Sequence, residues 1–123
     1  MLEILATGTP HQIGLEHGNQ AKQHVARAII FYQGLFKKNC SMSWEQVKSF
    51  ALKYDAYLSS DWPQYREEIQ GVAAGAGVTY EDILALNVRT EIAFGAFNDG
   101  CTALSWKGEG KSILAQNWDW NPK

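Results

Sequence analysis

The run Asp99-Gly100-Cys101-Thr102 places a thiol directly after a glycine. A glycine at position 100 leaves its carbonyl uncrowded and allows backbone conformations that other residues resist. The Cys101 thiol can attack that carbonyl and form a thioester through an N-to-S acyl shift, and water can then hydrolyse the thioester. The Gly100–Cys101 bond is therefore a candidate cleavage site, and its product would be a new chain that begins at Cys101.

Such a terminus suits catalysis, because one residue then carries both a nucleophile and a base. A free α-amino group titrates at about 7.7–8.0, and a thiol has a reference pKa of about 8.5. An amine that is partly deprotonated near neutrality can activate the neighbouring thiol. Cys101 is therefore a candidate catalytic nucleophile, although a cysteine after a glycine is by itself more often structural.

Asp119 is the second candidate catalytic residue. If the hairpin loop were centred on Glu109, Cys101 would face Asn117 across the ladder. Asp119 would then be the diagonal neighbour of Cys101 on the same face, at about 7–8 Å. A loop that differs by one residue would put Asp119 on the other face.

Other polar residues carry weaker signals. Arg89 and Glu91 join Asn117 as candidate pocket residues, but a structural ion pair or a solvated helix face explains them equally well. Cys40 follows a predicted helix end and is expected to be a structural thiol. The histidines and cysteines have no standard zinc spacing, and the glycines at 71, 75 and 77 lack a preceding strand and do not form a dinucleotide fingerprint. We therefore expect neither a metal nor a cofactor.

The elements that position these residues are mainly helical. We expect a short strand over 2–7 and then a helix over 10–36, with Thr9 as N-cap and Pro10 at the first helical position. Gly14 and Gly18 lie four residues apart on one helix face, which predicts close approach of another backbone. Lys37 and Lys38 suit a helix C-terminus.

Three further helices are predicted, over 44–58, 62–75 and 80–92. Their expected caps are Ser43, Asp61 and Thr79. The inward positions are predicted from helical spacing to be Trp44, Val47, Phe50, Ala51, Tyr54, Leu58, Tyr65, Ile69, Val72, Ile83, Leu86, Val88 and Ile92. A breaker-rich stretch at 97–100 ends the helical part.

Two strands are expected after this stretch, over 102–106 and 112–118, joined by a hairpin turn at 107–111. The chain is thus predicted to be α+β, with a helical segment over 1–100 and a β segment over 101–123. The second strand lacks partners in the rest of the sequence, so we expect the chain to be a piece of a longer protein.

Composition and charge argue against nucleic-acid binding and against membrane association. The 123 residues are 46% hydrophobic and 12% aromatic, as in a folded domain. The net charge is −2, and no basic stripe is visible, so nucleic acid is not an expected partner. We also expect no membrane association and an intracellular location, because the first residues do not form a signal peptide and no apolar run is long enough to span a bilayer.

Taken together, several runs resemble the isopenicillin N acyltransferase family, which comprises acyl-coenzyme A:6-aminopenicillanic acid acyltransferases and related cysteine peptidases. The resemblance extends from end to end in the same order. The matching runs are Gly8-Thr9-Pro10, Ile13-Gly14, Glu16-His17-Gly18, Trp62-Pro63-Gln64-Tyr65, Glu67-Glu68-Ile69, Gly71-Val72-Ala73, Leu86-Asn87-Val88-Arg89-Thr90-Glu91, Asp99-Gly100-Cys101-Thr102 and Gln116-Asn117-Trp118-Asp119.

The resemblance implies a parent protein with the αββα sandwich of N-terminal-nucleophile hydrolases and a precursor that cleaves itself at Gly100–Cys101. Residues 1–100 would be the α subunit, and the β subunit would begin at 101. Cys101 matches the nucleophile, and Asp119 matches the aspartate that orients the new terminus. The implied substrates are an acyl-coenzyme A or an amide, and the implied partner is the remaining β-subunit sequence. The compartment would be the cytoplasm or the peroxisome.

The resemblance covers only the N-terminal part of such a protein. The family's oxyanion-hole asparagine and a later arginine lie in the part that is not covered, and one lost oxyanion donor costs about 10²–10³ in rate. We therefore expect the parent protein to be an efficient enzyme, and not these 123 residues alone. The alternative is a truncated or degenerate paralogue that acts as a non-catalytic binding or regulatory partner.

Overall fold

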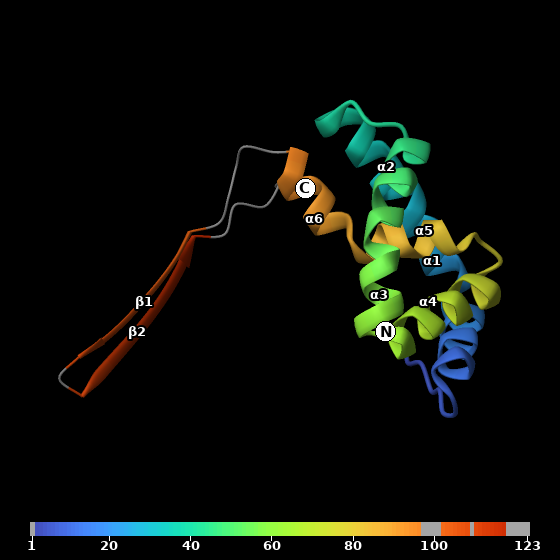
Figure 1. Ribbon diagram of the computed structural model, residues 1–123, viewed down its shortest axis with the longest axis horizontal. Coiled ribbons are helices and arrows are strands. Elements are labelled where there is room, and N and C mark those ends of the chain that lie inside the picture. Colours follow the sequence, from blue (N-terminus) through green and yellow to red (C-terminus); the bar gives the residue numbers. More distant parts are fainter. Residues whose placement is uncertain (1, 97–101, 109, 118–123) are drawn as a thin grey trace.

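The computed structural model describes residues 2–96, 102–108 and 110–117. Helices make up the first part and a two-stranded antiparallel hairpin the second, which confirms the α+β expectation at this level (Figure 1). The elements are α1 (Pro10–Cys40), α2 (Trp44–Ala51), the 3₁₀ turn η1 (Leu52–Tyr54), α3 (Asp55–Asp61), α4 (Pro63–Ala76), α5 (Tyr80–Asn87), α6 (Arg89–Ala96), β1 (Thr102–Gly108) and β2 (Lys111–Asn117).

The long helix α1 begins where its capping residues predict. The Thr9 side chain accepts a hydrogen bond from the Gln12 backbone, and the Gln12 side chain accepts one from the Thr9 backbone. The helix continues four residues beyond the expected end, to Cys40, and Ser41 caps it in the left-handed conformation with φ 55°. The strand expected over 2–7 is wrong, because the backbone of Leu5 is bonded through both its N–H and its carbonyl to the Gln20 side chain.

The second and third expected helices are divided differently. The turn η1 interrupts the helix predicted over 44–58, so α2 and α3 are separate. Asp61 ends α3 and is not the cap of α4, whose N-cap is Trp62 without a side-chain hydrogen bond. Tyr65 was expected inward but is 52% exposed. Gly77, with φ +72°, ends α4.

Thr79 caps α5 as predicted, in a capping box with Asp82. The helix expected over 80–92 is nevertheless two helices, because Val88 leaves the helical conformation with φ −98° and ψ 15°. The break directs α6 away from the axis of α5 (Figure 1). Ile92 of α6 is buried against Phe36, Val47 and Leu84, which form the larger apolar cluster.

The helices α1 and α4 approach each other through glycines, as the spacing of Gly14 and Gly18 predicts. A Cβ added to Gly14 would lie 2.0 Å from the carbonyl oxygen of Glu68, and one added to Gly18 would lie 2.3 Å from that of Val72. From the other side, a Cβ on Gly71 would lie 2.2 Å from the carbonyl oxygen of His11. The backbones are therefore too close for any side chain at these positions.

The hairpin has both expected strands but a tighter connection. Gly108 pairs with Lys111, which leaves positions 109 and 110 to connect the strands, and Gly110 has φ +74°. Every residue of β2 is exposed. The hairpin lies away from the helices in this structure (Figure 1).

Candidate functional site

The residues predicted to carry the chemistry lie next to the two described strands in the sequence. Gly100, Cys101 and Asp119 lie outside the described residues. The described ladder starts at Thr102, the next residue after Cys101, and ends at Asn117, two residues before Asp119. The roles of the three residues therefore remain predictions.

The register of the ladder differs from the register expected for a loop centred on Glu109. Thr102 pairs with Asn117, so the expectation that Asn117 faces Cys101 is wrong by one residue. The physical reason is the two-residue connection, which shifts every cross-strand pair relative to a loop centred on Glu109. The condition for placing Asp119 diagonal to Cys101 is thus not met by the described ladder.

Arg89 takes part in a structural contact. Its Nε donates a hydrogen bond to the Tyr32 hydroxyl at 2.9 Å, and its Nη1 donates to the Leu86 carbonyl at 2.6 Å. The guanidinium also lies over the Tyr32 ring, 5.4 Å from its centre. Arg89 thereby connects the start of α6 to α1 and to the end of α5.

The three candidate pocket residues are not brought together in the part of the chain that the structure describes. Glu91 is exposed on α6, and Asn117 is exposed at the end of β2. Arg89 is engaged with Tyr32 and Leu86. None of the three lines the cavity that the helices form.

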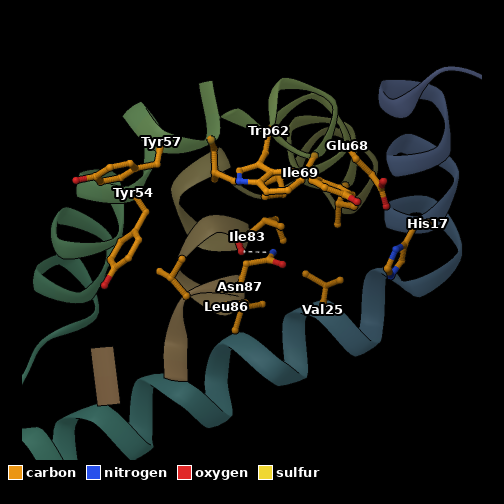
Figure 2. Close-up of a pocket in the computed structure, with 14 residues that line it drawn as sticks. His17, Val25, Tyr54, Tyr57, Trp62, Glu68, Ile69, Ile83, Leu86 and Asn87 are labelled. Atoms are coloured by element: carbon orange, nitrogen blue, oxygen red, sulfur yellow. Dashed lines mark hydrogen bonds between the residues drawn. The ribbon is translucent and has the colours of Figure 1, made fainter. Parts of the chain in front are cut away.

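That cavity is an open apolar groove of about 540 Å³ between α1, α3, α4 and α5 (Figure 2). Its walls are mainly aliphatic and aromatic, with few polar groups. The lining residues are His17, Val25, Tyr54, Tyr57, Leu58, Trp62, Tyr65, Glu68, Ile69, Val72, Ile83, Leu86, Asn87 and Val88. Apolar walls with a few polar groups are typical of small-molecule sites.

Aromatic side chains form part of the wall of the groove. Trp62 and Tyr65 pack with ring centres 5.8 Å apart, and both are about half exposed. The Asn87 side chain points into the groove, with its amide donating to the Ile83 carbonyl at 2.9 Å (Figure 2). The sequence predicted Tyr65 in the core. It did not predict the groove, because the residues that line the groove lie far apart in the chain.

A polar network joins the three helices α3, α4 and α5. Arg66 of α4 donates from Nε to Oδ1 of Asp55 at 2.8 Å and from Nη2 to Oδ2 at 3.2 Å. The Tyr80 hydroxyl of α5 donates to the same carboxylate. These bonds, chiefly that from Arg66, lower the pKa of Asp55. Burial, together with the hydrogen bond to Asp55, raises the pKa of Tyr80 and keeps its hydroxyl protonated as a donor.

Cys40 is the other cysteine of the chain, and its surroundings do not favour a nucleophile. Burial raises the pKa of its thiol above the ordinary value, which lowers the thiolate fraction at neutral pH. The described residues contain no group of three or more metal-ligating side chains. Among the described helices, none is both long and apolar enough to cross a membrane.

Comparison with known proteins confirms the resemblance to the isopenicillin N acyltransferases. The chain is 36% identical over 121 residues to a protein from Emericella nidulans, named the acyl-coenzyme A:6-aminopenicillanic-acid-acyltransferase 40 kDa form. The match covers 97% of this chain but 34% of the relative, an extent consistent with an N-terminal part. No protein-family model matches the chain.

Proposed function

We propose that the chain is the nucleophile-bearing N-terminal part of a self-processing cysteine acyltransferase or amidohydrolase. One observation carries the proposal, which is the similarity to the Emericella nidulans acyltransferase over 97% of the chain, a span that includes Asp99-Gly100-Cys101-Thr102. The name of that relative points to acyl-coenzyme A as donor and an amine as acceptor. Amide hydrolysis is the same chemistry with water as acceptor.

The processing step follows from the chemistry of the Gly100–Cys101 bond. The Cys101 sulfur attacks the Gly100 carbonyl carbon, the C–N bond breaks, and the nitrogen takes up a proton to become the free amine. Water then attacks the thioester, which releases the Gly100 carboxylate and restores the thiol. The new α-amine can afterwards accept the thiol proton when an acyl donor arrives.

The described elements support this reading of positions 100 and 101. The helical body ends with α6 at Ala96, and β1 begins at Thr102, so the predicted bond lies between the two parts of the fold. A cleavage there would leave each helix and each strand intact. Asp119, which by resemblance orients the new terminus, follows β2 by two residues.

Intact-mass analysis of the gene's complete product tests the proposal. We expect two chains that separate between Gly100 and Cys101, and we expect Cys101→Ala to give one uncleaved chain. Cys40→Ala is the matched control, because it removes the other thiol and should leave cleavage unchanged. Wild-type protein that is folded but stays uncleaved would contradict the proposal.

The alternative is a non-catalytic binding or regulatory partner. It is favoured by the exposed apolar side chains of the hairpin, where Leu104, Trp106 and Ile113 are 59%, 49% and 53% exposed. An uncovered apolar face of this kind commonly contacts another protein. Reading the gene beyond Lys123 separates the two candidates: a stop codon favours the partner, and a long coding extension with strand patterns favours the enzyme.

A further inference from the structure

We propose that the apolar groove between α1, α3, α4 and α5 is the docking site for a segment of the same protein that follows Lys123 (Figure 2). The inference rests on the proposed function, because it takes the chain to be the N-terminal part of a longer product. The match with the Emericella nidulans acyltransferase covers 97% of this chain and 34% of that relative, so most of the relative's length has no counterpart here. That length can supply the element that covers the groove.

The side chains at the rim of the groove have the composition of a protein interface. Tyr57, Trp62 and Tyr65 line the groove and are 68%, 53% and 52% exposed. Tyrosine and tryptophan are enriched in the centres of protein interfaces, where charged residues are depleted. The described residues that line the groove include one carboxylate and no lysine or arginine. Exposed aromatic rings around aliphatic side chains therefore favour a polypeptide as occupant.

A small molecule fits the groove less well than a polypeptide does, although the apolar walls suit both. Ligand sites enclose most of a ligand and orient it with a few well-placed polar groups. Here the Asn87 side-chain amide is engaged with the Ile83 carbonyl at 2.9 Å. The aromatic rings of the rim are at least half exposed, so they enclose little.

One charged group adds a chemical requirement for the occupant. Figure 2 places Glu68 and His17 at one end of the groove, and Tyr54 and Tyr57 at the other. The Glu68 carboxylate is half-buried and has no ion pair among the described residues. A carboxylate beside apolar walls is stabilised by an opposite charge. The docking segment should thus present apolar side chains along its length and a lysine or arginine opposite Glu68.

Trp62→Ser tests the aromatic rim in the cleaved product, whose two chains are held together by non-covalent contacts. Serine is a favoured N-cap, the position that Trp62 occupies in α4, so the helix should form as before. We expect the dissociation constant of the two chains to rise at least about tenfold, as for a truncated interface hot spot. Ile30→Ser is the matched control, because Ile30 is 68% exposed on α1 and does not line the groove. Equal effects of the two changes would contradict the docking role.

Glu68→Gln tests the charge. We expect it to raise the same dissociation constant about two- to fivefold, as for a partly exposed ion pair, and to weaken the dependence of that constant on salt. Glu67→Gln is the matched control, because Glu67 is the exposed neighbour on α4 and does not line the groove. Equal effects of these two changes would overturn the assignment of a basic residue opposite Glu68.

Photo-cross-linking from the groove identifies the occupant directly, whether or not the product is cleaved. The change Tyr65→p-benzoylphenylalanine puts a photoreactive group at the rim in the gene's complete product. Position 65 is half exposed, so the fold should accept the larger side chain. We expect a cross-link within one copy of the protein to a peptide that follows Lys123, located by mass spectrometry.

Each other cross-linking result would overturn the docking role. A cross-link to residues 102–117 would assign the groove to the hairpin, a product of twice the mass would assign it to a second copy, and no cross-link in the folded protein would exclude a polypeptide. Any of these in a product that cleaves would leave the proposed function intact. A downstream cross-link in folded protein that stays whole would support the docking and overturn self-processing alone. A coding sequence that stops after Lys123 would overturn both.

Discussion

The carboxylate of Asp55 receives hydrogen bonds from two other elements. Arg66 approaches it with two nitrogens and Tyr80 with its hydroxyl, so the ionised form of Asp55 is stabilised in the folded state. The pKa of Asp55 is lowered by these bonds, first by that from Arg66 and then by that from Tyr80. In the unfolded chain the carboxyl has an ordinary pKa, near 3.8.

The lowered pKa of Asp55 predicts how stability changes with pH. Because the folded pKa lies below the unfolded one, the stabilisation is present above a pH of about 4 and is lost as the pH falls through the folded pKa. Asp55→Asn should therefore lower the free energy of unfolding at neutral pH, and the gap to wild type should narrow below a pH of about 4. Urea titrations of both proteins at several pH values measure the gap.

Asp61→Asn serves as the control for this experiment, because Asp61 is exposed at the end of α3. Its effect on the free energy of unfolding should be small at neutral pH. A gap for Asp55→Asn that stays constant down to a pH of about 3 would contradict the prediction.

Residue types alone predicted some of the site but not its contacts. Gly100 and Cys101 could be predicted from the sequence because the attack of the thiol on the glycine carbonyl involves only two adjacent residues. Arg89 was expected in a pocket, a solvated face or an ion pair, and it instead contacts Tyr32, which lies 57 positions away. No spacing rule connects these two residues, since only the packing of α6 against α1 brings them together.

At the scale of elements, the contact between α1 and α4 depends on the glycines. Gly14 and Gly71 face each other so closely that a Cβ at either would meet backbone atoms of the opposite helix. Backbone atoms cannot rotate away as a flexible side chain can, so a substitution must push the helices apart.

Gly14→Ala is therefore expected to lower the free energy of unfolding by about 2–3 kcal/mol, as for overpacked cores. Gly34→Ala in the same helix is the matched control, because an added Cβ there meets no atom within 4 Å. This control should raise the free energy of unfolding by about 0.5–1 kcal/mol through helix propensity alone. Chemical denaturation measures both, and equal effects of the two substitutions would refute the close-packing argument.

Local signals predicted helix starts better than helix breaks. Thr9, Ser43 and Thr79 form capping boxes as their sequences indicate, because each box acts within four residues. The breaks at η1 and Val88 were not predicted. The apolar spacing continues across both breaks, so periodicity could not distinguish one helix from two.

At the scale of the whole molecule, the structure has two apolar surfaces without cover among the described residues. One is the groove of Figure 2. The other is one face of the hairpin, where Leu104 pairs with Ala115 and Trp106 with Ile113. A two-stranded hairpin is marginally stable in water unless its apolar face is covered.

The hairpin face predicts that these 123 residues associate when produced alone. The double change Leu104→Ser and Ile113→Ser should shift the protein toward monomer, because it removes two of the largest exposed apolar groups of that face. Leu114→Ser is the control, since Leu114 is 81% exposed on the opposite face. We expect it to have the smaller effect.

Sedimentation equilibrium at several concentrations measures the association. A wild-type chain that stays monomeric over the whole concentration range would contradict the prediction. Equal shifts by the double change and by Leu114→Ser would show that the two faces do not differ.

The sequence by itself determined the helical character of the first part, three capped helix starts, the hairpin and the resemblance to the acyltransferases. These depend on residues that interact within a few positions or on runs that match one by one. The tertiary structure alone decided the groove, the partner of Arg89 and the exact backbone that Gly14 meets. His17 and Asn87 of the groove are 70 positions apart, and such residues meet only after the helices pack. Packing depends on the sum of many weak contacts, which no short pattern encodes.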